Sequence, residues 1–474
     1  MRIALLLAAT VALMAAAPPP DEKSDEKVAA ALRDRAVAGG NVAMEVVSEL
    51  TTRFGARPAG SVSERASAEW LAVRLRSFGF RNVKVHRYPI TGWTRGMESA
   101  EIVGPNPQSL IATALGGSPA TPAGGVEGDV VLFDSLDALK LAPVGSLTGK
   151  IAMITQAMPN AMRGYGYGQV GPARAFGPSE AAKRGAVAFL LRSLATGSER
   201  FAHTGSTRYV DGVVAIPSFA LAVPDAEQVE RLAKLGEAVR LRLFSSAAYV
   251  PGAMTSQVSG DIMGSGAADE IVLLGAHLDS WDLGTGAIDD GAGVAIATAA
   301  AKLIGEQKRK ARRTVRVVLY GSEEVTQPGA ADVSGRAYSD TPGLAIDKHV
   351  LAMESDSGAD RVYALSLPKG VDASPFAEAA MRVLTPLRIV RSRDGPGSGG
   401  VDIGPLVARG VPTFVLEQDM GRYFAYHHTA NDTLDKIEPD ALNQNVAALA
   451  SLVWLAADSD VDFRALATAK DPVR

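Results

Sequence analysis

The chain has 474 residues, no cysteine and only six histidines. The absence of cysteine excludes disulfides, thiolate metal ligands and a lipid-anchored cysteine, so any transition-metal site must use histidine and carboxylate side chains. Acidic and basic residues nearly balance, 52 against 48, which leaves a net charge of −4. No overall field would recruit nucleic acid or an anionic membrane, and specificity must come from a local site.

The N-terminal stretch MRIALLLAATVALMAAA combines an early arginine, an apolar run and an end of small residues. This pattern predicts a secretory signal peptide over residues 1–17 rather than a membrane span. Residues 18–29 are expected to be a flexible leader, because PPPDEKSDEK offers no large apolar group to bury. We therefore expect an exported protein, periplasmic or secreted, without stable membrane insertion after signal removal.

The length and the hydrophobic content of 47% allow more than one domain. Near Gly116 the sequence pattern changes to short runs rich in β-forming residues, such as GDVVLFD and GKIAMIT, which are separated by turns that begin with glycine. We interpret residues 116–248 as a smaller inserted domain, with residues 30–115 and 249–474 forming one discontinuous larger domain. Within the insertion, GYGYGQVGP at Gly164 predicts a loop, which could reach over a site in the larger domain.

From Gln257 onward, apolar runs typical of strands alternate with helical segments. EIVLLGAHLD, TVRVVLYGSEE and HVLAMESDSG have the character of strands, whereas GVAIATAAAKLIGEQ has a helical pattern. Such alternation predicts an α/β fold with a mixed, mostly parallel central sheet flanked by helices. Acidic residues follow several of these strands, and the carboxyl edge of an open sheet is where ligand sites form.

The stretch LLGAHLDSWDLGTGAIDDGAG places one histidine and four aspartates in a single short segment: His277, Asp279, Asp282, Asp289 and Asp290. Further on, two glutamates, one aspartate and two histidines also follow apolar runs: Glu323, Glu324, Asp356, His427 and His428. Each has a structural explanation when taken alone, since DDG is a common turn. Together they match the needs of two divalent cations about 3.5 to 4 Å apart, which are one bridging carboxylate and an imidazole plus a carboxylate for each metal.

In their order, His-x-Asp, Asp-Asp-Gly, Glu-Glu, Asp and His-Thr-x-x-Asp-Thr, these motifs resemble peptidase family M28 of co-catalytic zinc exopeptidases. AHLDSWDLGTGAIDDGAG, LYGSEEV, MESDSG and YHHTANDT are most similar to its carboxypeptidase Q branch. The resemblance implies two zinc ions per chain, bridged by Asp289. It places His277 and Asp356 on one zinc and Glu324 and His428 on the other. The insertion resembles the protease-associated (PA) domain that several members carry at this point.

The resemblance also implies roles for three neighbouring acids. Glu323 is expected to be the general base, which takes a proton from the attacking water and returns it to the leaving amine. Asp279 is expected to orient the imidazole of His277. Asp290 is not expected to bind metal, and the bond between Asp289 and Asp290 is expected to be a cis peptide.

Substrate contacts are less constrained. Spacing alone leaves His427 and His428 open as the ligand, but the family places its ligand directly before Thr-x-x-Asp-Thr, which favours His428. His427 would then either donate to an oxyanion or be an exposed neighbour, and Tyr426 has the same two interpretations. The loop SRDGPGSGGVDIGPL, with Gly399 and Gly400, is either a plain loop or one whose bare backbone approaches a peptide.

Selection of a free amine calls for an acid or a carbonyl near the metals, and Glu417 or Asp419 are candidates with an alternative capping role. The remaining histidines, His86, His203 and His349, are interpreted as structural. The expected substrate is a short peptide or dipeptide, without choice between aminopeptidase and dipeptidase. A homodimer is implied by the resemblance only.

Three alternatives compete with this prediction. M20-type dizinc hydrolases share the ligand types, but they separate the first aspartate from the bridging one by a much longer segment than the one between Asp279 and Asp289. A single-zinc aminoacyl cyclase on the same fold would use a subset of the ligands. A binding or receptor homologue would be expected to have lost ligands, but every matched position holds a competent residue.

Overall fold

The computed structural model describes residues 24–236, 238–327 and 333–468. The predicted signal peptide and most of the predicted leader lie outside the described residues. Within that leader, the prediction of a flexible segment is wrong for residues 24–29, which open helix α1 (Ser24–Val37). Glu26 is buried there and pairs with Arg382 of α10 (Pro375–Leu384) at 2.9 Å, so charged residues of this segment have a partner that the sequence did not reveal.

The larger domain is built on a five-stranded sheet with the order β1-β10-β12-β11-β13. The neighbours β11, β12 and β13 run parallel, whereas β1 and β10 pair antiparallel with each other and β10 pairs antiparallel with β12. The strands are β1 (Arg81–Thr94), β10 (Ala248–Ile262), β11 (Ala267–His277), β12 (Arg313–Tyr320) and β13 (His349–Glu354). The predicted mixed α/β fold is thus confirmed, and its three site-bearing strands are the parallel ones.

Helices cover both faces of this sheet, as the alternation of elements predicted. Side chains of a strand alternate between faces, and in β11 Ile271 and Leu273 belong to one core cluster while Val272 and Leu274 belong to another. Residues of α8 (Val333–Ser339) and α11 (Gly404–Val407) belong to the first cluster. The second includes α1, α2 (Ala43–Phe54), α3 (Val62–Ser77), α7 (Ala292–Gly305) and α13 (Pro439–Asp458).

A small second sheet extends the larger domain beyond β13. Its order is β15-β14-β16, and a parallel bridge between Ala352 and Thr413 connects it to β13. Its strands and the nearby helices are β14 (Val362–Ser366), β15 (Val390–Arg391), β16 (Val415–Gln418), α9 (Lys369–Asp372), α12 (Tyr423–Tyr426) and α14 (Phe463–Thr468).

The inserted domain contains an eight-stranded sheet with the order β3-β2-β9-β5-β6-β7-β8-β4. Three of its strands precede Gly116, so the predicted start of the insertion is too late: the sheet begins at Glu98, where β2 pairs with β9. These early strands are three to five residues long, too short to show a clear alternating pattern in the sequence. The strands are β2 (Glu98–Ile102), β3 (Gln108–Leu110), β4 (Ala112–Ala114), β5 (Val126–Phe133), β6 (Ile151–Ile154), β7 (Ala188–Arg192), β8 (Ser218–Leu221) and β9 (Arg240–Ser245).

Helices also cover this second sheet. Residues of α4 (Leu136–Leu141) and α5 (Tyr165–Lys183) pack with one set of strand side chains, and residues of α6 (Val223–Lys234) pack with the alternate set. The loop predicted at Gly164 is therefore wrong, because helix α5 begins at Tyr165 and continues past Pro172 and Pro178. Packing against the sheet outweighs the low helix propensity of glycine and proline in this segment.

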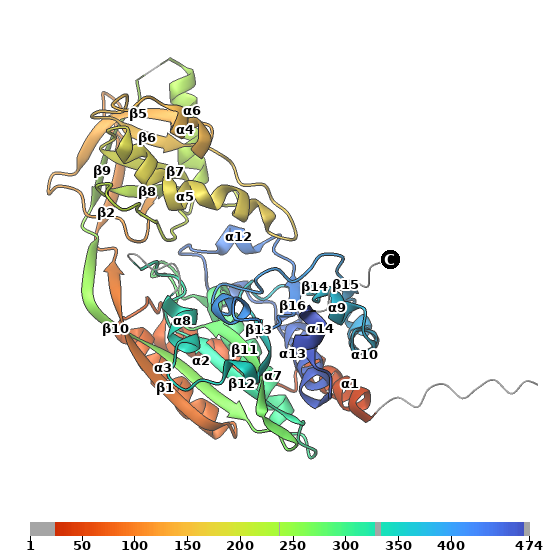
Figure 1. Ribbon diagram of the computed structural model, residues 1–474. Coiled ribbons are helices and arrows are strands. Elements are labelled where there is room, and N and C mark those ends of the chain that lie inside the picture. The colour runs from red at the N-terminus through yellow and green to blue at the C-terminus, as the bar shows by residue number, and fades with distance from the viewer. Residues whose placement is uncertain (1–23, 237, 328–332, 469–474) are drawn as a thin grey trace, which may run out of the picture.

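The antiparallel ribbon of β1 and β10 leads from the larger domain into the insertion (Figure 1). In the same view α12 lies between α5 of the insertion and the central sheet. The carboxyl ends of β11, β12 and β13 open on this side, so residues that follow these strands face the inserted domain.

No helix within the described ranges is long and apolar enough to span a membrane.

Candidate metal centre

The parallel register of three strands brings the predicted ligands to one edge of the sheet. His277 ends β11 and lies opposite Tyr320, the last residue of β12, and Gly275 lies opposite Glu354, the last residue of β13. The turn after β12 carries Glu323 and Glu324, and the turn after β13 carries Asp356. Side chains that are distant from one another in the sequence are therefore neighbours in space.

Asp289 lies at the centre, with its two carboxylate oxygens turned to different partners. Oδ1 is 3.2 Å from Nε2 of His277, and Oδ2 is 3.2 Å from Nε2 of His428. Nε2 of His277 is also 3.4 Å from Asp356, and Nε2 of His428 is 3.1 Å from Glu324. The five predicted ligands thus form two pairs that share one carboxylate.

The donor atoms of these side chains are close enough together to hold cations between them. Asp289 Oδ2 and Glu324 Oε1 are buried and have no hydrogen-bond partner among the described residues. Burial, reinforced by Asp289, raises the pKa of Glu324 to about 7, and burial also raises the pKa of Asp356. Buried carboxylates in such proximity require positive charge to stay ionised, and nitrogen and oxygen donors without sulfur suit zinc. Three overlapping groups here could each hold an ion: Asp289 with His427 and His428, His277 with Glu323 and Glu324, and His277 with Asp290 and Asp356.

Backbone carbonyls select the tautomer of both imidazoles. Nδ1 of His277 lies 2.9 Å from the carbonyl oxygen of Asp279, and Nδ1 of His428 lies 3.2 Å from that of Thr204. Because a carbonyl can only accept, the proton must sit on Nδ1 in each case. Nε2 is then the nitrogen of each ring that points at the carboxylates and is left to bind a metal.

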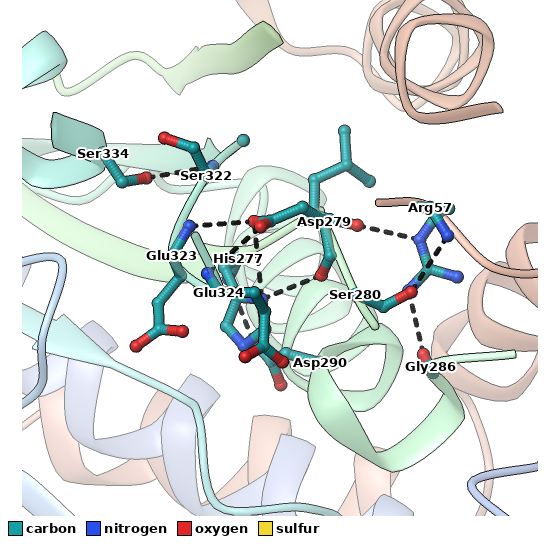
Figure 2. A network of polar contacts seen from close by, with 12 residues as sticks. Arg57, His277, Asp279, Ser280, Gly286, Asp290, Ser322, Glu323, Glu324 and Ser334 are labelled. Atoms are coloured by element: carbon teal, nitrogen blue, oxygen red, sulfur yellow. Dashed lines mark hydrogen bonds and ion pairs between the residues drawn. The ribbon is translucent and has the colours of Figure 1, made fainter. Parts of the chain in front are cut away.

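The side chain of Asp279 has a different role from the one expected. Its Oδ1 and Oδ2 accept hydrogen bonds from the backbone N–H groups of Glu323 and Glu324 at 3.1 and 3.2 Å. Its carboxylate is 3.7 Å from Nδ1 of His277, farther than its own backbone carbonyl. Figure 2 shows both glutamate side chains extending from the turn that Asp279 holds.

Both carboxylate oxygens of Asp290 accept hydrogen bonds from backbone N–H groups. One of its oxygens accepts from the N–H of Gly293, in the first turn of α7, and the other accepts from the N–H of His277 at 3.0 Å. It thereby joins the start of α7 to the end of β11. The peptide bond between Asp289 and Asp290 is cis, as the resemblance implied.

Two buried charged residues, Arg57 and Asp432, hold the glycine-threaded loop before Asp289. Arg57 donates to the carbonyls of Leu278 and Gly286 at 2.8 and 2.9 Å, and the carboxylate of Asp432 accepts from the N–H of Ile288 at 2.7 Å. Figure 2 shows Arg57 beside this loop. Asp432 is the aspartate of the motif HTAND, but Arg57 lies far before the loop in the sequence, in a segment without a motif. Sequence reasoning missed it for that reason.

A cavity of about 370 Å³ opens over Asp289. Glu323 lines it and has no hydrogen bond to its carboxylate among the described residues. Burial and the neighbouring Glu324 raise the pKa of Glu323 well above its usual range. The stretch at Gly164 that was expected to reach over the site does so, with Tyr167 and Gly171 at the cavity. Sequence reasoning did not identify the further wall residues from the inserted domain and from α12 with the segment before it: Arg174, Ala175, Ser206, Arg208, Met420, Tyr423 and Phe424.

His427 also lines this cavity. Its ring stacks on that of His428 with centroids 3.5 Å apart, and its Nε2 is 3.7 Å from Asp289. Burial and the neighbouring His428 lower the pKa of His427 well below its usual value, so the ring is neutral. Of the two alternatives, an exposed neighbour is wrong, since His427 is buried.

Other predicted contacts do not face the cavity. The ammonium of Lys436 lies over the ring of Tyr426, which lines a separate small cavity, whereas Tyr423 and Tyr167 are the tyrosines that line the cavity over Asp289. Gly399 and Gly400 lie against Thr413 and Glu354 so closely that a Cβ would overlap them. Their missing side chains therefore serve packing, while Val401 beside them reaches the cavity.

The two candidates for amine selection are also elsewhere. Glu417 accepts from the hydroxyl of Tyr363 at 2.8 Å and lines a different cavity. Asp419 accepts from the N–H of Gly421 at 2.9 Å, a contact within the turn before α12, whose N-cap is Arg422 and receives no side-chain hydrogen bond. Among the histidines interpreted as structural, His349 contacts Tyr338 and His86 is exposed. His203 is buried beside His428, and burial lowers its pKa to about 3.

Comparison with known proteins gives a consistent result. The sequence profile described as Peptidase family M28 matches residues 257–453. Mouse carboxypeptidase Q is 33% identical over 435 residues, covering 91% of this chain and 90% of its own length, and the human protein of that name is 32% identical over the same number of residues.

Among solved structures, a peptidase M28 precursor from Shewanella amazonensis SB2B is 42% identical, with a TM-score of 0.88 over 93% of this chain and 98% of its own. A zinc aminopeptidase from Bacillus subtilis has a TM-score of 0.61 at 17% identity, covering 90% of this chain and 97% of its own, and shares the fold.

Proposed function

We propose, for a chain that belongs to peptidase family M28, that it is an exported dinuclear zinc exopeptidase that hydrolyses the amide bond of short peptides. The observation that carries the proposal is the position of Asp289, whose two oxygens face His277 and His428 at 3.2 Å each. Asp356 and Glu324 complete the two halves. This is the arrangement that a carboxylate bridging two zinc ions needs.

In this proposal Glu323 moves the proton. When bound, the zinc pair supplies Lewis acidity that polarises a peptide carbonyl and lowers the pKa of water. Glu323 lies beside the ligand Glu324 but keeps a free carboxylate at the cavity wall, held at its backbone by Asp279. A carboxylate with a raised pKa accepts a proton from water and passes it to a leaving amine more readily than one with an ordinary pKa.

His427 is proposed to contact the substrate rather than a zinc ion. Its neutral ring lies in the cavity, 3.7 Å from Asp289, whereas His428 has the shorter distance and an Nδ1 fixed by a carbonyl. A neutral imidazole can donate one hydrogen bond to the oxygen on which charge develops during amide hydrolysis.

Two arginines of the inserted domain support a substrate with a free carboxylate. Arg174 and Arg208 line the cavity, and neither forms an ion pair with a carboxylate within the described ranges. The guanidinium of Arg174 donates to the Tyr167 hydroxyl at 2.6 Å and to the Thr204 carbonyl at 3.4 Å. A guanidinium without a carboxylate partner in a small cavity is suited to the terminal carboxylate of a short peptide. We therefore favour a dipeptidase over a general aminopeptidase.

The experiment that tests this function is digestion of a dipeptide and tripeptide library by the purified protein, with zinc content measured alongside. Each peptide is offered with free and with blocked amino and carboxyl ends. We expect zinc-dependent cleavage of short peptides with both ends free. Absence of cleavage at two zinc ions per chain, or cleavage without metal, would contradict the proposal. Export by the signal peptide and a homodimer remain predictions, testable by fractionation and by sedimentation.

A further inference from the structure

The two halves of the metal centre are held by different parts of the molecule. His277 and Asp356 follow strands of the central sheet, and the carbonyl that accepts from His277 Nδ1 belongs to Asp279, two residues along the same chain segment. In contrast, the carbonyl that accepts from His428 Nδ1 belongs to Thr204 of the inserted domain. The second half thus depends on a segment that lies 224 residues away in sequence.

Thr204 and His428 exchange two hydrogen bonds. The N–H of Thr204 donates to the carbonyl of His428 at 3.0 Å, and Nδ1 of His428 donates to the carbonyl of Thr204 at 3.2 Å. His428 has φ of 62°, a left-handed backbone that residues other than glycine rarely adopt. The paired bonds fix both this backbone and the direction of the imidazole.

The same segment also holds the second ligand of this half. The hydroxyl of Ser206 donates to the backbone carbonyl of Glu324 at 2.5 Å and accepts from the N–H of Thr326 at 3.3 Å. Thr204 and Ser206 therefore reach both Glu324 and His428. Neither of them contacts His277 or Asp356 by a hydrogen bond within the part of the chain that the structure describes.

The segment is itself anchored at the domain boundary. The Thr204 hydroxyl donates to the carbonyl of Ala114 at 3.0 Å and accepts from Nη2 of Arg95 at 3.1 Å. Arg95 is buried and pairs with both oxygens of Asp282 at 2.7 and 2.8 Å. Asp282 follows β11, so this arginine links the inserted segment to the chain that carries His277 and Asp289.

We infer that Thr204 and Ser206 are positioning residues for one zinc ion only, the one between Glu324, His428 and Asp289. This inference rests on the proposed function. The inserted domain is then a structural part of one half of the metal centre, and loosening its segment 204–206 weakens that half while the half of His277 and Asp356 is retained. Groups that orient a ligating histidine typically contribute about 10- to 100-fold to metal affinity.

The test compares zinc binding by the full mature protein and its variants. Ser206→Ala removes the hydroxyl at Glu324, Thr204→Val removes the anchoring hydroxyl while keeping the shape, and Thr204→Ser restores it. Ser179→Ala is the matched control, since Ser179 is a buried inserted-domain serine that accepts from Val210 N–H at 3.0 Å, away from the ligands. Zinc content is measured against graded chelator, and thermal unfolding of the zinc-free proteins verifies folding.

We expect wild type, Ser179→Ala and Thr204→Ser to bind two zinc ions. Ser206→Ala and Thr204→Val should keep one with unchanged affinity and bind the other about 10- to 100-fold more weakly. Equal weakening of both ions, or wild-type affinity for both in the two variants, would overturn the inference but leave the proposed function intact. A wild-type protein that binds fewer than two ions would instead overturn the proposed function, and this inference with it.

Discussion

The carboxylate of Asp279 accepts a hydrogen bond from the backbone N–H of Glu323 at 3.1 Å. Its other oxygen accepts from the next N–H, that of Glu324, at 3.2 Å. Asp279 therefore determines where the turn after β12 places the proposed base and one proposed ligand. The imidazole of His277, in contrast, is oriented by the backbone of Asp279 and not by its side chain.

Asp279→Asn should impair turnover more than metal binding at His277. The amide of asparagine would direct N–H groups at a backbone N–H, which displaces the turn that carries Glu323. We expect kcat to fall about 10- to 100-fold, the range seen for groups that orient a site, with zinc at His277 retained. Steady-state kinetics and zinc analysis would check this, with Asp419→Asn as a control outside the cavity. Loss of zinc from His277 would show that the side chain orients the imidazole after all.

Glu323→Gln should remove the proton acceptor while leaving the zinc ligands in place. We expect kcat to fall about 10²- to 10⁴-fold at unchanged zinc content, which is the usual contribution of a general base. Glu417→Gln serves as a control, because Glu417 lines a different cavity. Unchanged hydrolysis by Glu323→Gln would exclude it as the base.

His277→Ala should lose zinc as well as activity. His277 faces both Asp289 and Asp356, so its removal takes a nitrogen ligand from one half of the centre and leaves buried carboxylates without a partner. His86→Ala changes an exposed histidine on β1 and should keep full zinc content. Elemental analysis of both dialysed proteins gives the answer, and full zinc content in His277→Ala would remove it from the ligand set.

Arg174→Gln should affect substrates according to their carboxyl end. A charge-assisted hydrogen bond contributes about 1.5 to 3 kcal/mol, so we expect KM for a dipeptide to rise about tenfold or more. Hydrolysis of the same dipeptide as its amide should change little. Arg192→Gln is the control, since Arg192 pairs with Glu227 away from the cavity. An equal effect on both substrates would mean that Arg174 does not bind the carboxylate.

Glu64 should make stability depend on pH. It is buried in α3, and burial and Asp279 raise its pKa from 4.5 to about 8. Between these two pH values the folded state keeps the proton of Glu64 while the unfolded state loses it. The stability that the protonated Glu64 contributes is therefore complete below about pH 4.5 and is lost as the pH rises to about 8. Each pKa unit corresponds to about 1.4 kcal/mol.

Thermal unfolding of Glu64→Gln and wild type at pH 5 and pH 8 isolates this effect. The variant should gain stability relative to wild type at the higher pH, because glutamine has no proton to lose. Glu69→Gln, an exposed position on the same helix, should show no such difference. A pH-independent difference between Glu64→Gln and wild type would exclude the raised pKa.

The sequence predicted the half of the site that depends on strand ends. Apolar runs located β11, β12 and β13, and parallel strands must present His277, Glu324 and Asp356 at one edge. These site residues could be predicted because acidic residues and histidines are rare directly after apolar runs, and because the order of the motifs resembles one family. Their positions now agree with that expectation, while their roles remain proposals.

The residues that complete the site could not be predicted from the sequence, because they act through backbone groups or across domains. Thr204 contributes a carbonyl, which any residue type has, and Arg57 donates to carbonyls of a distant loop. Arg174 was hidden because α5 contains glycines and prolines that predict a loop. Only tertiary packing places these residues at the cavity.

The central claim is that Asp289 bridges two zinc ions. Anomalous diffraction from crystals of the zinc-loaded wild-type protein, recorded at the zinc edge, tests it most directly. We predict two peaks about 3.5 to 4 Å apart on either side of the Asp289 carboxylate, one beside His277 and Asp356 and the other beside His428 and Glu324. A single peak, or peaks away from Asp289, would contradict the claim.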